Sequence, residues 1–198
     1  MDANDITNGS DPLATFRAWM KDAEAAEPND PNALALATAS REGLPSVRMV
    51  LMKRVDERGF AFYTNAESQK GVELAENPRA AMCFHWKSLR KQVRVSGMVT
   101  ELSAEDADDY FRSRSRLSQL GAAASEQSRL LESREVLEAR VRLLETVFPE
   151  EIPRPEYWKG YVLRPERIEF WQDGAGRLHD RFLFVRLEDV WRMERLFP

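Results

Sequence analysis

Closely spaced strand patterns constrain the fold of this chain more than any other feature. From residue 33 to residue 102 the apolar residues recur as they do along strands, and turn-forming residues at 41–43 and 56–59 separate the segments. Short connections of this kind favour an antiparallel barrel over a parallel sheet that alternates with helices. The expected strands cover residues 33–39, 47–54, 60–63, 80–86 and 92–102, with a bulge at Gly97.

Helical patterns flank these strands. Asp11 and Pro12 predict the N-cap and first residue of a helix that ends near residues 29–32. A short helix is expected at 68–76, and a longer helical region at 103–148. Ser103 is the expected N-cap of that region, and its apolar stripe consists of Val136, Leu137, Val141, Leu144 and Val147.

Strand patterns return near the C-terminus and complete the same barrel. The predicted fold class is therefore α+β, mainly β, with an antiparallel barrel and flanking helices. We expect residues 1–10 to be disordered and residues 11–198 to form a single domain. The late strands are expected at 157–163, 167–172, 181–187 and 190–196.

Composition and charge exclude several classes of protein. The 198 residues carry a net charge of −4, which argues against a general nucleic-acid binder. No apolar run approaches the roughly 20 residues of a membrane span, and the polar N-terminus does not resemble a signal peptide, so we expect a cytoplasmic protein. A lone Cys83, expected to be buried and inert, excludes an internal disulfide. No metal site is predicted, because His85 and His179 lie far apart without a metal-binding motif.

A cluster of charged residues follows a glycine-containing turn near the C-terminus. It contains Arg177, His179, Asp180 and Arg181. On an extended strand Arg177 and His179 would point to one face and Asp180 to the other, because strand side chains alternate. Taken alone, this pattern is more typical of a solvated hairpin. An anionic or electron-rich partner would explain why two cationic or titratable groups lie side by side.

Two cations bracket the apolar run of the second strand. Arg48 and Lys53 are an odd number of residues apart, so on one regular strand they should face opposite sides. Both could serve one ligand only if the strand bulges or if the ligand lies across an edge or a subunit interface. A core strand with charged ends remains the alternative.

The segment after the third strand predicts an anion site. Thr64 and Glu67 have the spacing of a capping box, which would gather backbone N–H groups, Ser68 and Lys70 at a helix N-terminus. Such a place suits phosphate. An ordinary capped helix is the more common case.

Three arginines alternate at 112, 114 and 116 in the predicted helical region. On a helix, Arg112 and Arg116 are neighbours whose like charges repel by a few tenths of a kcal/mol. A bound phosphate would convert that repulsion into charge-assisted hydrogen bonds. The alternatives are a solvated basic face or a surface for nucleic acid.

Taken together, these segments resemble the pyridoxine (pyridoxamine) 5′-phosphate oxidase family from about Asp11 to Pro198. The resemblance implies an FMN-binding split β-barrel that forms a homodimer with the flavin in the interface. It also implies oxidation of pyridoxamine and pyridoxine 5′-phosphates to pyridoxal 5′-phosphate, with O2 as acceptor and H2O2 as product. It rests on RMVLMK at 48–53, FYTNAESQK at 62–70, HWKSLRKQVRVSG at 85–97, YFRSRSRLSQLG at 110–121, SEQS at 125–128 and IEFWQ…RLHDR at 168–181.

The resemblance assigns a role to each matching position. Arg177 and His179 are the expected catalytic residues, and groups from both subunits are expected to surround each flavin. Positions that match substrate contacts are Lys53, Tyr110, Arg114, Ser118, Arg177 and His179. Positions that match flavin contacts are Arg48, Met49, Val50, Leu51, Met52, Lys53, Tyr63, Thr64, Gln69, Lys70, Gln92, Gln127, Ser128, Trp171 and Arg181.

Three positions depart from the family pattern. Gln69 stands where the family usually has arginine, so one contact to the flavin phosphate becomes neutral. Ser115 replaces a usual proline, and Ala123 a frequent tryptophan. Residues 1–10 do not match the N-terminal segment that closes over the site in some members, so we expect a more open pocket.

Two other functions remain open at the level of sequence. The first is a split-barrel flavin protein with another substrate, such as a flavin reductase, or a flavin- or haem-binding module. The second is a nucleic-acid surface at residues 112–116, which the acidic net charge disfavours. A flavin spectrum that pyridoxamine 5′-phosphate bleaches without oxygen would separate the three.

Overall fold

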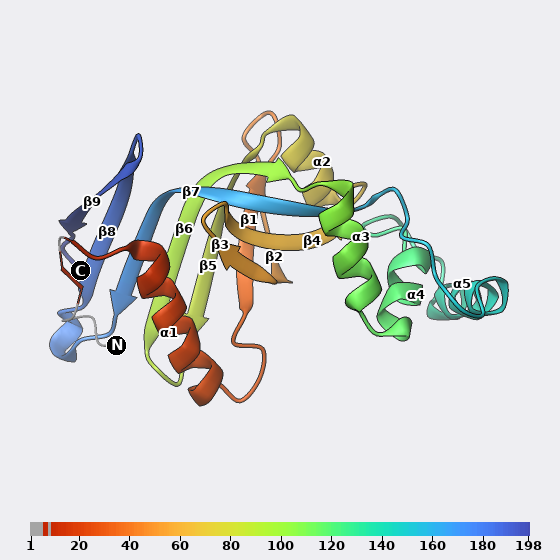
Figure 1. Ribbon diagram of the computed structural model, residues 1–198, viewed down its shortest axis with the longest axis horizontal. Coiled ribbons are helices and arrows are strands. Elements are labelled where there is room, and N and C mark those ends of the chain that lie inside the picture. The colour runs from red at the N-terminus through yellow and green to blue at the C-terminus, as the bar shows by residue number, and fades with distance from the viewer. Residues whose placement is uncertain (1–5, 8) are drawn as a thin grey trace.

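Nine antiparallel strands form the framework of residues 6–7 and 9–198, the part of the chain that this computed structural model describes (Figure 1). The sheet has the order β2-β1-β5-β6-β7-β4-β3, with β8 paired to β7 and β9 paired to β8. This confirms the predicted antiparallel, mainly β fold. The strands are β1 (Ala33–Ala39), β2 (Pro45–Leu51), β3 (Arg54–Asp56), β4 (Gly59–Asn65), β5 (Arg79–Trp86), β6 (Lys91–Glu101), β7 (Trp158–Gln172), β8 (Asp180–Leu187) and β9 (Val190–Arg195).

The long strand β7 divides the sheet into two branches. Residues 158–163 pair with β4 and residues 167–172 pair with β8, while β6 pairs with both halves. The register between β6 and β7 shifts at Gly97, where Glu166 is the extra residue on β7. A side chain at Gly97 would place its Cβ 2.0 Å from the Arg164 carbonyl oxygen, so the backbones approach too closely for any other residue. The bulge predicted at Gly97 is confirmed.

Helix α1 (Pro12–Ala26) packs its apolar face against the sheet. The Asp11 side chain accepts hydrogen bonds from two backbone N–H groups of the first turn, which confirms the predicted N-cap. Phe16 and Trp19 are fully buried, with ring centroids 4.8 Å from Phe60 and 5.2 Å from Phe170. Truncating such a buried aromatic residue to alanine typically costs about 3–5 kcal/mol of stability. This packing ties α1 to the strands on which the site is built.

A second, smaller cluster lies among the helices at the end of the molecule away from β8 and β9 (Figure 1). Phe111, Leu120, Ile152 and Trp158 are its buried residues. No residue of α5 is fully buried. Of the predicted apolar stripe, Val141 and Leu144 are half-buried against this cluster, whereas Val147 is exposed. The helices near this cluster are α3 (Ala104–Ser113), α4 (Arg116–Ala124) and α5 (Arg134–Val147). The remaining helix, α2 (Gln69–Glu76), follows β4.

Several predicted boundaries differ from the structure. The strand expected at 47–54 is two strands, because β2 ends at Leu51 and β3 begins at Arg54. The strands expected at 157–163 and 167–172 are one continuous strand, β7. The helical region at 103–148 is three helices, and the first begins after Ser103, whose Oγ accepts a hydrogen bond from the Asp106 N–H as predicted.

The expectation for Cys83 was wrong in part. The strand β5 alternates, so Met82 and Phe84 occupy the core face while Cys83 points away from it and is half-buried. Burial still raises the pKa of the Cys83 thiol.

The segment expected to be disordered falls partly outside the described residues, namely at 1–5 and 8. Within the remainder, Ile6 is 4% exposed and belongs to the main core cluster. The Thr7 N–H donates to Ser10 Oγ at 2.9 Å. No helix in the described residues is long and apolar enough to cross a membrane.

Candidate active site

A cavity of about 770 Å³ is lined by residues of β2, β4, α2, α3, α4 and β7. It brings together four of the five predicted segments that precede residue 130, namely those at 48–53, 62–70, 110–121 and 125–128. Two hydroxyl residues that were not predicted, Ser46 and Ser115, and the buried Trp158 also lie on its wall. The predicted site residues on the wall are Arg48, Met49, Val50, Leu51, Lys53, Tyr63, Thr64, Gln69, Lys70, Tyr110, Arg114, Ser118, Gln127 and Ser128.

Arg48 and Lys53 reach the same cavity within one protomer. Because β2 ends at Leu51, Lys53 lies in the break before β3 and the alternation of a regular strand does not apply to it. The expectation that they face opposite sides was therefore wrong. Met52, in the same break, is 7% exposed, packs in the main core and does not line the cavity.

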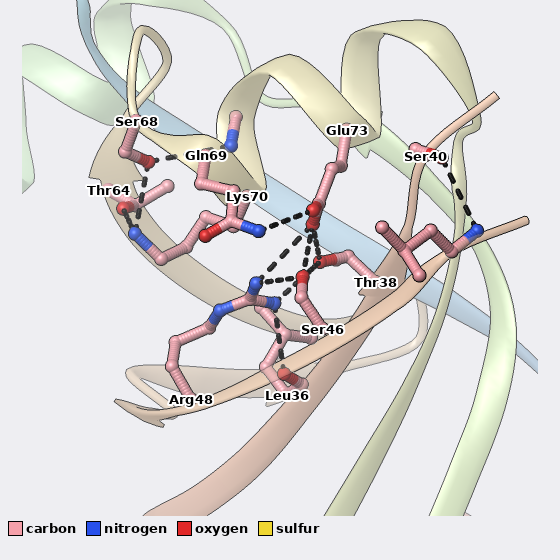
Figure 2. A network of polar contacts seen from close by, with 12 residues as sticks. Leu36, Thr38, Ser40, Ser46, Arg48, Thr64, Ser68, Gln69, Lys70 and Glu73 are labelled. Atoms are coloured by element: carbon pink, nitrogen blue, oxygen red, sulfur yellow. Dashed lines mark hydrogen bonds and ion pairs between the residues drawn. The ribbon is translucent and has the colours of Figure 1, made fainter. Parts of the chain in front are cut away.

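The predicted capping box at the start of α2 is also wrong. Thr64 belongs to β4, and the N-cap is Ser68, whose Oγ accepts a hydrogen bond from the Gly71 N–H at 3.4 Å. The gathering of polar groups that the capping box implied nevertheless exists, because β4 leads directly into this helix. Thr64, Ser68 and Lys70 meet at its N-terminus (Figure 2).

Lys70 is a buried cation that contacts neutral oxygens. Its Nζ donates to Gln127 Oε1 at 2.8 Å, to Ser68 Oγ at 3.0 Å and to Thr64 Oγ1 at 3.3 Å. Among the described residues no carboxylate lies within ion-pair distance of it. Burial, followed by the charge of Arg48, lowers the pKa of Lys70 to about 8. A cation held in this way is suited to an anionic ligand.

Arg48 is held by a network that ends on Glu73 (Figure 2). Its terminal nitrogens donate to the Leu36 carbonyl at 3.1 Å, to Thr38 Oγ1 at 2.5 Å and to Ser46 Oγ. Glu73 Oε2 lies 3.3 Å from Arg48 Nη2. Predicted site residue Gln69 also points to Glu73, since its Nε2 donates to Glu73 Oε1 at 3.0 Å.

Aromatic rings support the opposite end of the cavity. Tyr63 stacks on Tyr110 and on Trp158, with ring centroids 4.1 and 5.3 Å apart. The Arg114 guanidinium lies over the Trp158 ring at 5.1 Å, and the Lys53 Nζ lies 5.9 Å from the Tyr110 centroid. The stack therefore presents two cations to one wall of the cavity.

Arg114 has a buried nitrogen without a partner. Its Nη1 makes no hydrogen bond among the described residues, and burial lowers the pKa of the guanidinium. Ser115 Oγ donates to Ser118 Oγ at 2.8 Å, which leaves the Ser118 hydroxyl proton free to donate elsewhere. An unsatisfied charged donor is costly unless a ligand completes it.

The remaining predicted residues form a second cluster on β6, β7 and β8. Gln92 pairs with Trp171 across the β6–β7 ladder, and Trp171 pairs with Arg181 across the β7–β8 ladder. Arg181 is tied to the buried carboxylate of Glu169 at 2.8 Å, and Glu169 also pairs with Arg94 at 3.0 Å. None of the three predicted residues lies on the cavity wall of the same protomer.

Arg177 and His179 precede strand β8, so the expectation that they share a strand face was wrong. Arg177 ends the 3₁₀ turn η2 (Ala175–Arg177) with φ at +67°, and its side chain is exposed. His179 is half-buried, with its ring 4.8 Å from Trp171. Its Nδ1 lies 3.1 Å from the Gly174 N–H and 3.0 Å from Asp173 Oδ1, and it bonds one or the other according to whether it carries a proton.

Two family matches together cover most of the chain. Residues 20–148 match the family described as pyridoxamine 5′-phosphate oxidase, and residues 158–198 match the family described as the pyridoxine 5′-phosphate oxidase C-terminal dimerisation region. The chain belongs to the pyridoxamine 5′-phosphate oxidase family. The resemblance and the homodimer expected from the sequence are confirmed, and the dimerisation region carries Trp171, Arg177, His179 and Arg181.

Relatives of the pyridoxamine 5′-phosphate oxidase family match over nearly their whole lengths. Proteins named pyridoxine/pyridoxamine 5′-phosphate oxidase from Gluconobacter oxydans and Sinorhizobium fredii are each 55% identical to this chain. The first match covers 96% of this chain and 95% of the relative, and the second covers 100% of both. A protein of the same name from Anaeromyxobacter dehalogenans is 57% identical, over 95% of this chain and 96% of its own.

Solved structures show the same fold. The structure of PhzG from Burkholderia lata, in complex with tetrahydrophenazine-1-carboxylic acid, has a TM-score of 0.93 and 33% identity, over 99% of this chain and 96% of its own. A pyridoxamine 5′-phosphate oxidase-related, FMN-binding protein from Nostoc punctiforme has a TM-score of 0.77 and 18% identity, over 96% of this chain and 100% of its own, and shows the fold alone.

Sequence reasoning missed Trp158 and Glu73. Trp158 lies in the strand predicted at 157–163, and nothing in the local pattern indicates that its ring supports Arg114. Glu73 carried a usable signal, because it follows Gln69 by four residues on a predicted helix and such pairs are neighbours. Its contacts with β1 and β2 depend on the tertiary fold.

Proposed function

We propose that this protein oxidises pyridoxamine 5′-phosphate and pyridoxine 5′-phosphate to pyridoxal 5′-phosphate on bound FMN, with O2 as the electron acceptor and H2O2 as the second product. Family membership and the names of relatives at 53–57% identity support this activity. Bound FMN would supply the redox chemistry by accepting a hydride from C4′ of the substrate. The cytoplasmic location expected from the sequence stays a prediction.

The observation that carries the proposal is the unpartnered Arg114 Nη1 on the cavity wall. The guanidinium is fixed over Trp158, and the Ser118 hydroxyl and Tyr110 share the same wall. A phosphate monoester supplies the oxygen acceptors that these donors lack. Arg114, Tyr110 and Ser118 would therefore bind the substrate phosphate, as the family resemblance implies.

The residues at the other end of the cavity fit the FMN phosphate. Lys70 and Arg48 are two cations at the N-terminus of α2, and Thr64, Ser68 and Gln127 add polar groups. Gln69, where the family has arginine, turns its amide toward Glu73 and leaves this end with one positive charge fewer. The flavin would extend from here along Met49, Val50, Leu51 and Lys53, which line the same cavity.

The C-terminal cluster would complete the site from the second subunit. Gln92, Trp171 and Arg181 lie apart from the cavity in one protomer, and the dimerisation region contains two of them. We assign these three residues to the flavin. Arg177, which is exposed and free to reach a ligand, would orient the C4′ group and stabilise charge that develops there. His179 would position the substrate and could hold a proton at Nδ1 or Nε2.

The test is a spectrum followed by an anaerobic reaction. The purified protein should show a flavin spectrum, and pyridoxamine 5′-phosphate should bleach it when oxygen is absent. Pyridoxamine without its phosphate is the matched control and should bleach it far more slowly at equal concentration. A protein that takes up no FMN, or one that a reduced phenazine precursor bleaches but pyridoxamine 5′-phosphate does not, would contradict the proposal.

A further inference from the structure

Glu73 places a negative charge beside the end of the cavity that gathers two cations. Its side chain is buried, and it lies on α2 facing Arg48 of β2. Burial raises the pKa of Glu73, but hydrogen bonds from Ser46, Thr38 and Gln69 outweigh that effect and hold the pKa below its usual value. The carboxylate is therefore charged at neutral pH. A site built only to attract phosphate gains nothing from such a neighbour.

Two hydroxyl groups join Glu73 to Arg48 in a closed network (Figure 2). Thr38 Oγ1 and Ser46 Oγ each accept a hydrogen bond from Arg48 and donate one to Glu73 Oε2. A hydroxyl has one proton to give, so each needs a donor on one side and an acceptor on the other. The arrangement fixes the Arg48 side chain before any ligand binds.

The charge of Glu73 also acts on Lys70. It favours the charged form of the lysine, whereas the charge of Arg48 disfavours it. The negative charge of Glu73 that attracts Lys70 repels an anion, so Glu73 would weaken the hold of Lys70 on a bound phosphate. Without Glu73, Arg48 and Lys70 would repel each other in the free protein with no internal anion to compensate them.

We infer that Glu73 is a built-in counter-anion that keeps Arg48 and Lys70 together in the free protein and, in doing so, weakens the binding of the flavin phosphate. This inference rests on the proposed function, because FMN is the ligand proposed for that end of the cavity. Glu73 is thus a positioning residue that does not itself donate to the ligand.

The variant Glu73→Gln separates charge from shape. The amide keeps an oxygen that can accept from Thr38 and Ser46, and the Gln69 amide can turn to match it. Apoproteins are titrated with FMN and with riboflavin at pH 6.5, where Lys70 is charged, and binding is followed by flavin fluorescence. Riboflavin lacks the phosphate, so the ratio of the two affinities isolates the phosphate end.

The preference for FMN over riboflavin should rise on the order of fivefold in Glu73→Gln, the size of a partly screened charge interaction. The unfolding midpoint of the free protein should fall by a few degrees, as expected for roughly 1 kcal/mol in a protein of this size. Glu76→Gln, an exposed position on the same helix, is the matched control and should change neither quantity. An unchanged or reduced preference for FMN in Glu73→Gln would overturn the inference.

If the Glu73→Gln apoprotein does not stay folded, a second measurement tests the inference on the FMN-bound protein. The variant is then purified with FMN, and the release of FMN on dilution is timed against the wild type. Slower release supports the inference, and equal or faster release overturns it. A wild-type protein that shows no preference for FMN over riboflavin would refute the proposed cofactor, whereas equal preferences in wild type and variant would refute only the role of Glu73.

Discussion

The two ends of the sheet hold their cations in different ways. At the cavity end, Arg48 and Lys70 are surrounded by oxygen acceptors from their own protomer. At the other end, Arg177 sits exposed in a turn, in a left-handed backbone conformation. The first arrangement is ready to bind an anion without help. Under the proposed function, the second would bind a ligand only when another subunit brings one to it, so binding and catalysis would be divided between two places in the chain.

The largest effect that tests this division is expected for Arg177→Ala. Removing a group that stabilises developing charge should lower kcat by roughly 10²-fold, while FMN stays bound. Steady-state rates and the flavin spectrum measure the two quantities separately. A near-normal rate would remove Arg177 from the chemistry, and loss of flavin would place it with the cavity end instead.

Arg114→Ala should act on the other half of the comparison. Loss of a charged hydrogen bond to the substrate phosphate should raise KM roughly 10- to 100-fold and leave kcat close to that of the wild type. A pure kcat effect would contradict the assignment.

Mixing Arg114→Ala and Arg177→Ala subunits tests whether one site uses residues from both protomers. If one site draws on both protomers, the mixed dimer regains activity above either parent; if it does not, the sites are contained within single chains.

The cavity end should respond to pH through Lys70. The pKa of Lys70 is lowered to about 8, so the side chain is charged below that pH and neutral above it. Affinity for FMN should therefore fall as pH rises past 8, by up to about tenfold per pH unit. Affinity for riboflavin, measured by the same fluorescence titration from pH 7 to 9, should not follow this trend. Parallel curves for the two flavins would show that Lys70 does not hold the phosphate.

The smallest effect is expected for Trp158→Phe. A smaller ring weakens the support for the Arg114 guanidinium by roughly 0.5–1 kcal/mol, so KM should rise two- to fivefold. The change should be absent in an Arg114→Ala background, because the supported group is then missing. Steady-state kinetics of the two single variants and the double variant decide the point, and additive effects would contradict the contact.

Local rules predicted the framework well and the site only in part. Alternation, turn residues and the helix caps Asp11 and Ser103 depend on neighbours in sequence, so they can be recognised without the fold. The orientation of Arg177 and His179 could not, because η2 and the left-handed Arg177 replace the expected strand. A Cβ at Gly174 would lie 2.0 Å from the Leu178 carbonyl oxygen, and this close approach is visible only in three dimensions.

The cavity shows the same limit in another form. The motifs that line the cavity could be recognised in the sequence, and the family resemblance predicted that they form one site. The pairing of Arg48 with Glu73 joins β2 to a helix that is distant in sequence, and only the packing of α2 on β1 reveals it. Residues whose partners come from another element, or from a second subunit, are the ones that sequence patterns leave undetermined.

The extra residue Glu166 has a consequence for both ends of β7. In its first half the core side chains are Tyr161 and Leu163, and in its second half they are Ile168 and Phe170, so the parity of the strand reverses between them. Trp158 and Trp171 would point in opposite directions on a regular strand, since they are an odd number of residues apart. With one insertion between them, both rings point away from the main core cluster. A deletion at this position would turn either Trp158 or Trp171 toward that cluster.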